Sequence, residues 1–193
     1  ARSIIRKGVD ETANIVKLTY GAKGRNVIVA RPHMLPYITK DGVTVAKEAM
    51  LDDEIANIGA YLIKQVAART DDGVKDGTTS STILAQAIVN EADSMLKQGV
   101  NPVYVKRGID KAMEFAVKKL KTLSTKIKTN TELRNIATIS ANGDKEIGKL
   151  IAEIYKKTGK DGVIKVEEWL TTETTVEYTK GYEIDNGFLN WGF

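Results

Sequence analysis

Helical hydrophobic periodicity runs through most of the first 123 residues and limits the folds open to this chain. Apolar side chains recur at steps of three or four residues, the spacing of one helix face, over four segments: 3–19, 42–73, 77–98 and 105–120. Glycine follows or closes three of them, at Gly21, Gly73 and Gly99, as expected at helix ends. The pattern predicts a helix-dominated first part.

The same periodicity predicts that large apolar side chains form the buried face of each helix. For the second segment these are Ile55, Ile58, Leu62, Ile63 and Val66. For the third they are Ile83, Leu84, Ala87, Ile88 and Met95. For the fourth they are Val105, Ile109, Ala112, Met113, Ala116, Val117 and Leu120.

The pattern changes near Ser124, where threonine, lysine and asparagine become frequent, and we expect a domain boundary there. Two helices follow, over 133–141 and 146–157. Short β-branched runs predict strands within 25–30 and 37–39, and alternating residues predict a hairpin from 162–168 and 171–181. The expected fold class is mainly α with small β elements (α+β).

Composition excludes several chemistries. The chain has no cysteine and one histidine, His33, so disulfides, zinc clusters of His and Cys, and cysteine nucleophiles are excluded. Any metal would be held by oxygen ligands. No apolar run reaches the roughly 18 residues of a membrane helix, and the first residues lack the apolar core of a signal peptide. We expect no membrane partner and a cytoplasmic location, with an organelle matrix as the alternative.

Positive charge is concentrated between 97 and 128, although the whole chain carries only +4. This stretch contains nine lysines or arginines and only two acidic residues, Asp110 and Glu114. A solvated helix face explains the stretch most simply. The alternative is a non-catalytic interaction module that binds an acidic partner or nucleic acid through this basic region. Few aromatic side chains accompany the charges, so we expect no specific nucleic-acid partner.

The segment DGTTSST, from Asp76 to Thr82, opens a predicted helix. Free N–H groups, the positive helix end and several hydroxyls make such a turn suited to phosphate, with a cation between Asp76 and the phosphate. The simpler interpretation is that Asp76 only N-caps the helix. Gly143, Gly148 and Lys149 fit the G-x-x-x-x-G-K spacing of a phosphate loop, but Leu150 stands where the hydroxyl residue of such a loop should be. The hydrophobic pattern of this stretch is that of an amphipathic helix.

Two other loops carry residues suited to phosphate. TYGAKGRNV places Gly21 and Gly24 between a helix and a strand, and ITKDGVTV supplies Lys40 beside Asp41. Taken alone, the first is a helix C-cap with a turn and the second is a turn that ends a strand.

Together, TYGAKGRNV, ITKDGVTVAKE, DGTTSSTILAQAI and ATISAN resemble, in order and spacing, the leading half of the group I chaperonins, the GroEL family. PVYVKRGIDKA, GKLIAE and GKDGVIKVEE extend the resemblance over nearly the entire chain. Ala22 stands where that family usually has proline, and Lys75 stands where it usually has glycine.

The resemblance implies site residues for ATP and Mg²⁺. The nucleotide-binding residues would be Thr19, Tyr20, Gly21, Ala22, Lys40, Asp76, Gly77, Thr78, Thr79 and Ser80. Asp76 would also hold the metal, and Asp41 would be the catalytic residue that positions the attacking water. Phe188 and Phe193 would begin a polypeptide-binding surface.

The resemblance also implies domains, activity and partners. Residues 1–123 would be the first part of an equatorial ATP-binding domain, 124–179 part of an intermediate hinge domain, and 180–193 the start of an apical domain. The expected function is an ATPase that captures, encapsulates and releases unfolded polypeptide, in homo-oligomeric rings of seven with a GroES-type cochaperonin. An isolated chain of this length is expected to hydrolyse ATP poorly or not at all.

Overall fold

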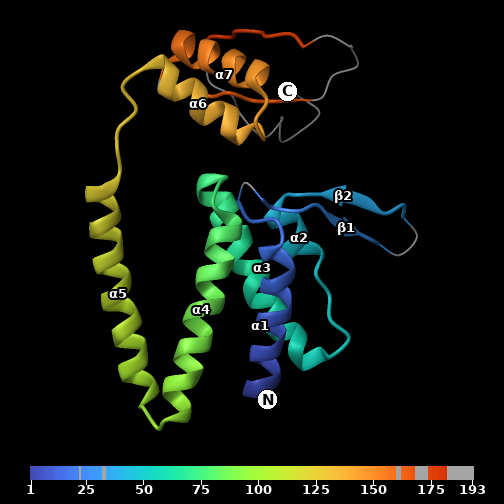
Figure 1. Ribbon diagram of the computed structural model, residues 1–193, viewed down its shortest axis with the longest axis vertical. Coiled ribbons are helices and arrows are strands. Elements are labelled where there is room, and N and C mark those ends of the chain that lie inside the picture. Colours follow the sequence, from blue (N-terminus) through green and yellow to red (C-terminus); the bar gives the residue numbers. More distant parts are fainter. Residues whose placement is uncertain (22, 32–33, 160–161, 168–173, 182–193) are drawn as a thin grey trace, which may run out of the picture. The chain divides into compact units, whose positions relative to one another are not determined.

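A computed structural model describes the chain except for residues 22, 32–33, 160–161, 168–173 and 182–193 (Figure 1). The chain divides into two compact units, Ala1–Leu123 and Ser124–Phe193. The division falls at the residue where the composition changes. Among the described residues, no helix combines the length and the apolar character that crossing a membrane requires.

The first unit is built from helices and one small sheet. The predicted helical segment 42–73 is two helices instead of one, with residues 49–53 between them. Strands β1 (Val27–Val29) and β2 (Tyr37–Thr39) pair antiparallel. Helices α1, α3 and α4 pack side by side (Figure 1). The helices are α1 (Arg2–Lys17), α2 (Gly42–Glu48), α3 (Glu54–Val74), α4 (Thr78–Lys97) and α5 (Pro102–Leu123).

Small residues bring α1 and α3 into backbone contact. A Cβ atom at Gly59 would lie 2.0 Å from the carbonyl oxygen of Ile5, and one at Gly8 would lie 1.8 Å from that of Ala56. Two clusters of buried side chains fill the neighbouring space: Val9, Ala13 and Ile63, and Val16, Val43, Val45, Ala46 and Ala67. The core is therefore thin and made of small side chains.

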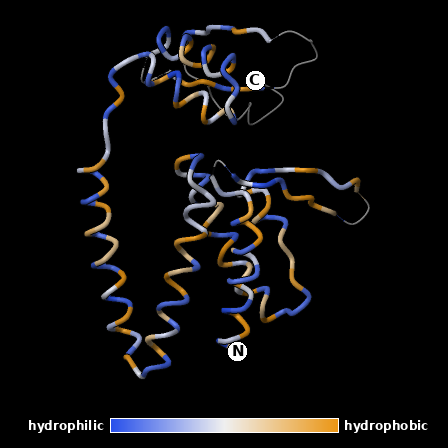
Figure 2. The backbone as a smooth tube through the Cα atoms, viewed as in Figure 1, coloured by the Kyte–Doolittle hydropathy of each residue, from blue (hydrophilic) through white to orange (hydrophobic). Residues whose placement is uncertain are grey.

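The predicted buried face of α3 is wrong except at Ile63, and none of the residues predicted for the buried face of α4 is buried. Ile63 is buried, but Ile58, Leu62 and Leu84 keep about half or more of their surface exposed, at 51%, 47% and 62%. On α3 the small residues face α1 instead, because only they permit the close approach. On α5, Val105 alone of the predicted face is buried, and apolar and polar residues alternate along its tube in Figure 2.

Helix α4 meets α1 through polar side chains. Gln86 Nε2 and Asn90 Nδ2 donate to Asp10 Oδ1 over 2.8 and 2.7 Å. Asp93 is 5% exposed and pairs with Lys97 at 2.7 Å. The hydrogen bond from Lys97 holds the pKa of Asp93 below its ordinary value. Arg2 and Arg6 of α1 also lie 3.5 and 3.6 Å from Asp93, and Ala85 and Val89 pack against the cluster of Val9, Ala13 and Ile63. Hydropathy alone could not predict this interface, because polar pairs accompany its small apolar contacts.

Gly59→Ala tests the α1–α3 contact. The added methyl meets a backbone oxygen that cannot yield, so we expect the free energy of unfolding to fall by about 3 kcal/mol, the upper end for overpacked cores. Gly73→Ala is the matched control on the same helix, since no atom lies within 4 Å of its Cβ position. It should raise stability by about 0.5–1 kcal/mol. Urea denaturation measures both, and equal midpoints for Gly59→Ala and wild type would contradict the packing.

The second unit contains the helix pair α6 (Asn130–Ser140) and α7 (Lys145–Thr158), which confirms the two helices predicted there. A capping box joins Thr129 and Glu132 at the start of α6. The predicted hairpin is not observed, since 162–167 and 174–180, the parts of it that the structure describes, form no strand. Alternation of apolar and polar residues indicates which side chains would share a face of a strand. It does not supply the partner strand whose backbone hydrogen bonds a sheet needs.

Candidate functional site

The threonine-rich turn starts α4 without a side-chain cap. Gly77 is the N-cap residue, with φ of 75° in the left-handed region that suits glycine. Asp76 accepts a hydrogen bond from the Gly77 N–H over 2.6 Å and remains exposed. The interpretation of Asp76 as a simple N-cap is therefore wrong, and the side chain stands outside the helix at its positive end.

Thr79 joins this turn to two distant segments. Its hydroxyl lies 3.2 Å from the hydroxyl of Thr19, which is 60 residues away and 6% exposed. A Cβ atom at Gly42 would lie only 2.2 Å from Thr79 Oγ1. Glycine at 42 is thus required for the first residue of α2 to touch the first turn of α4.

Lys40 lies against the loop that follows α1. A Cβ atom at Gly24 would lie 2.9 Å from Lys40 Cε and 2.2 Å from the Thr19 carbonyl oxygen. Three segments, 19–24, 40–42 and 76–79, therefore converge. They present two lysines, Lys23 and Lys40, with two carboxylates and several hydroxyls, groups of the kinds that neutralise and position phosphate and its cation.

Asp41 is fixed by its own helix. Its Oδ2 accepts from the Thr44 N–H over 2.9 Å and from the Thr44 hydroxyl, while its backbone N–H donates to Thr39 Oγ1 over 3.1 Å. Within the described part of the chain its second carboxylate oxygen has no hydrogen bond. Asp41 is an exposed residue.

The predicted site residues differ in how firmly the structure places them. Thr19, Lys40 and Thr79 are brought together, and Asp41, Asp76, Gly77, Thr78 and Ser80 are their neighbours in the same segments. Tyr20 is 54% exposed, and Gly21 adopts φ of 71° at the turn that Gly24 closes. Ala22, Phe188 and Phe193 lie outside the described residues.

Sequence reasoning missed Gly42 as a contact residue. Asp-Gly after a strand is a common turn signal, and it does not show that a hydroxyl from α4 occupies the space of a side chain. Sequence reasoning also missed the hydrogen bond that the Thr70 hydroxyl donates to the Ser81 hydroxyl over 2.9 Å, which connects α3 to the first turn of α4. In the part of the chain that the structure describes, no three His, Asp or Glu side chains gather at one point.

The excluded match at Gly143, Gly148 and Lys149 begins in the turn before α7, and its second glycine and its lysine lie in that helix. Gly148 is buried in α7, where a Cβ atom would lie 2.1 Å from Thr138 Oγ1 of α6. Lys149 is 70% exposed and lies 3.9 Å from Glu153. The glycine serves helix packing, and no phosphate loop forms there.

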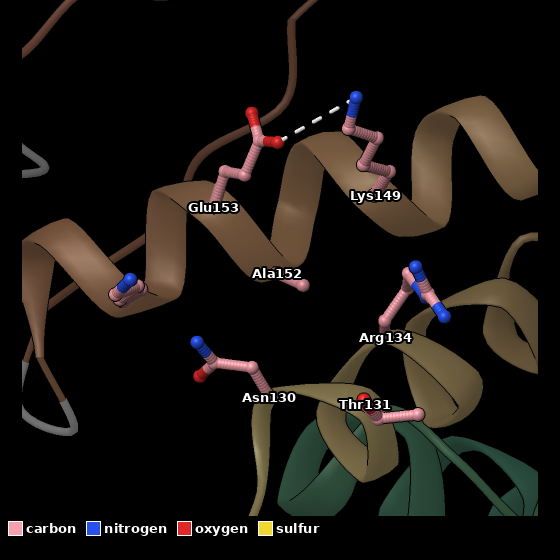
Figure 3. A pocket seen from close by; sticks show the side chains of 7 residues that line it. Asn130, Thr131, Arg134, Lys149, Ala152 and Glu153 are labelled. Atoms are coloured by element: carbon pink, nitrogen blue, oxygen red, sulfur yellow. Dashed lines mark ion pairs between the residues drawn. The ribbon is translucent and has the colours of Figure 1, made fainter.

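A shallow cavity of about 270 Å³ lies between α6 and α7. Figure 3 shows Ala152 of α7 facing Asn130 and Arg134 of α6, with the Lys149–Glu153 pair beyond them. None of the predicted nucleotide residues lines this cavity. Its lining is mostly exposed, and Ala152 is 7% exposed.

The first unit is helical, and three of its segments meet at the N-terminus of α4. The fold is similar to a crystal structure of the chaperonin from the bacteriophage EL 2 (Pseudomonas aeruginosa) in the presence of ATP-BeFx, with a TM-score of 0.68 and 26% identity. The match covers 81% of this chain and 28% of that chain, so this chain spans under a third of the phage protein's length. Residues 12–191 match the TCP-1/cpn60 chaperonin family, and the chain belongs to that family.

Proposed function

We propose that this chain binds Mg-ATP at the convergent loops and supplies the nucleotide switch of a protein-folding chaperonin. The observation that carries the proposal is the meeting of Thr19, Gly42 and Thr79 around one helix N-terminus. Local interpretations of the three loops do not explain why they converge. Family membership and the ATP analogue present with the phage chaperonin favour the same function.

Each residue has a distinct task in this proposal. Lys40 offsets phosphate charge, while the hydroxyls and free N–H groups of the α4 turn orient phosphate oxygens. Asp76 holds Mg²⁺, which when bound neutralises the triphosphate. Asp41 directs a water toward the terminal phosphate. Hydrolysis without a covalent intermediate needs mainly such positioning and charge compensation.

The partners are part of the same proposal. A nucleotide-dependent change in the hinge would expose and hide a surface for unfolded polypeptide. Subunits would assemble into rings, seven-membered by resemblance, with a GroES-type cochaperonin and a cytoplasmic location. Native mass measurement together with particle images tests the ring directly, and a monomer in the presence of nucleotide would contradict it.

Calorimetry of ATP binding to the native protein tests the central claim. We expect heat of binding with Mg²⁺ present and at least tenfold weaker binding after chelation, because the cation compensates the repulsion between Asp76 and phosphate. Inorganic phosphate alone serves as the control for non-specific anion binding. If Mg-ATP produces no heat of binding and does not shift the unfolding temperature, the proposed function is wrong.

A further inference from the structure

Lys75 adopts a conformation that lysine rarely occupies. It ends α3 with φ of 57° and ψ of 15°, in the left-handed region, where a Cβ atom is unfavourable. Its backbone N–H donates to the Asp71 carbonyl oxygen over 2.9 Å. Strain retained beside a candidate site calls for an interaction that the lysine side chain supplies.

That interaction is an ion pair with Asp71, which a second lysine shares. Asp71 Oδ2 lies 3.7 Å from Lys75 Nζ and 3.9 Å from Lys47 Nζ. The Asp71 side chain is 21% exposed, whereas the lysines are 76% and 52% exposed. The carboxylate thus lies largely inside the fold, with one cation from the α3–α4 turn and one from α2.

The two lysines belong to the segments that carry the two site carboxylates. Lys47 is in the last turn of α2, the helix that Asp41 caps, and Lys75 directly precedes Asp76. The α2–α4 contact itself is a glycine against a hydroxyl, at Gly42 and Thr79. Such a contact sets a closest approach and does not prevent separation.

We propose that Asp71 is a positioning residue that fixes the spacing between Asp41 and Asp76 by holding Lys47 and Lys75 together. This inference rests on the proposed function. Without the carboxylate, two like charges would face each other and favour separation of the two segments. Partly exposed ion pairs add little stability, but small displacements of catalytic groups have large effects on rate.

Asp71→Asn, made in the native protein, tests the proposal through a split between kcat and KM. We expect kcat for Mg-ATP hydrolysis to fall about tenfold through misplaced groups, and KM to stay within about twofold because the phosphate ligands remain. Asp71→Glu should restore most of the rate. Asp52→Asn is the matched control, since Asp52 is exposed and has no ion pair among the described residues.

The lysine pair distinguishes positioning from a general structural effect. Lys47→Met and Lys75→Met should affect kcat non-additively when Asp71 is present and additively in the Asp71→Asn background. An unchanged kcat in Asp71→Asn, or additive lysine effects in both backgrounds, would overturn the proposal.

Amide hydrogen exchange supplies a measurement that does not depend on nucleotide. Asp71→Asn should reduce protection about tenfold both in 42–48 and in 75–79, through more frequent local opening, while Asp71→Glu should not. Unchanged protection in 42–48 overturns the positioning claim even if ATP is never bound. Failure of wild type to bind Mg-ATP refutes only the proposed function, so the two failures are distinguishable.

Discussion

Asp41→Asn is expected to lower kcat for Mg-ATP hydrolysis by about 100-fold or more while Mg-ATP still binds. The substitution removes the charge that, under the proposed function, orients the attacking water. It keeps an oxygen that accepts from the Thr44 N–H, because asparagine is as good an N-cap as aspartate. Steady-state turnover and calorimetry on the native protein measure the two effects separately.

Asp41 also caps the N-terminus of α2, so the residue that replaces it must be chosen with care. Asp41→Ala removes both the charge and the cap, and should lower stability by about 1 kcal/mol in addition. Asp53→Asn is the matched control, because Asp53 caps α3 in the same way, accepting from the Ile55 and Ala56 N–H groups. Its kcat should equal that of wild type. Normal turnover in Asp41→Asn would show that the assigned task of Asp41 is wrong.

Asp76→Lys is expected to weaken Mg-ATP binding by about 100-fold, equivalent to about 2.7 kcal/mol. The change deletes a carboxylate ligand and places an ammonium group where the cation would lie. Because Asp76 is exposed and does not cap α4 with its side chain, we expect the fold to survive. Calorimetry with and without Mg²⁺ is the measurement.

The affinity of the Asp76→Lys variant for ATP without Mg²⁺ gives the sharper test. Free ATP carries more negative charge than Mg-ATP, so the lysine variant should bind it as well as wild type does or better. A thermal unfolding curve close to that of wild type confirms folding. Equal affinity of Asp76→Lys and wild type for Mg-ATP would exclude Asp76 from the metal site.

The backbone explains why glycine is common in the family at the position of Lys75. A residue with a Cβ atom costs about 1–2 kcal/mol in the left-handed region, and Lys75 has φ of 57° there. The structure places its ammonium group beside Asp71.

Local signals predicted the elements well because they act over a few residues. Gly73 and Gly99 lie at or near the ends of α3 and α4, and helical spacing marks what lies between the ends. The break between α2 and α3 at 49–53 was not predicted. The failures occurred where an element needs a distant partner. Leu84 and Ile88 are exposed because α4 meets the neighbouring helices through Ala85, Gln86, Val89 and Asn90. The segment at 162–167 forms no strand.

The order of residues alone determined the helices, the residue types of the site and the resemblance to the chaperonins, since each depends on neighbours in the chain. Only the tertiary structure decided that Thr19 and Gly42 meet Thr79, and that Asp71 holds two lysines. Apart from the Asp71–Lys75 pair, whose members are four residues apart, these contacts join residues far apart in sequence. Backbone packing at glycines and charge pairing set them, and neither leaves a periodic pattern in the sequence.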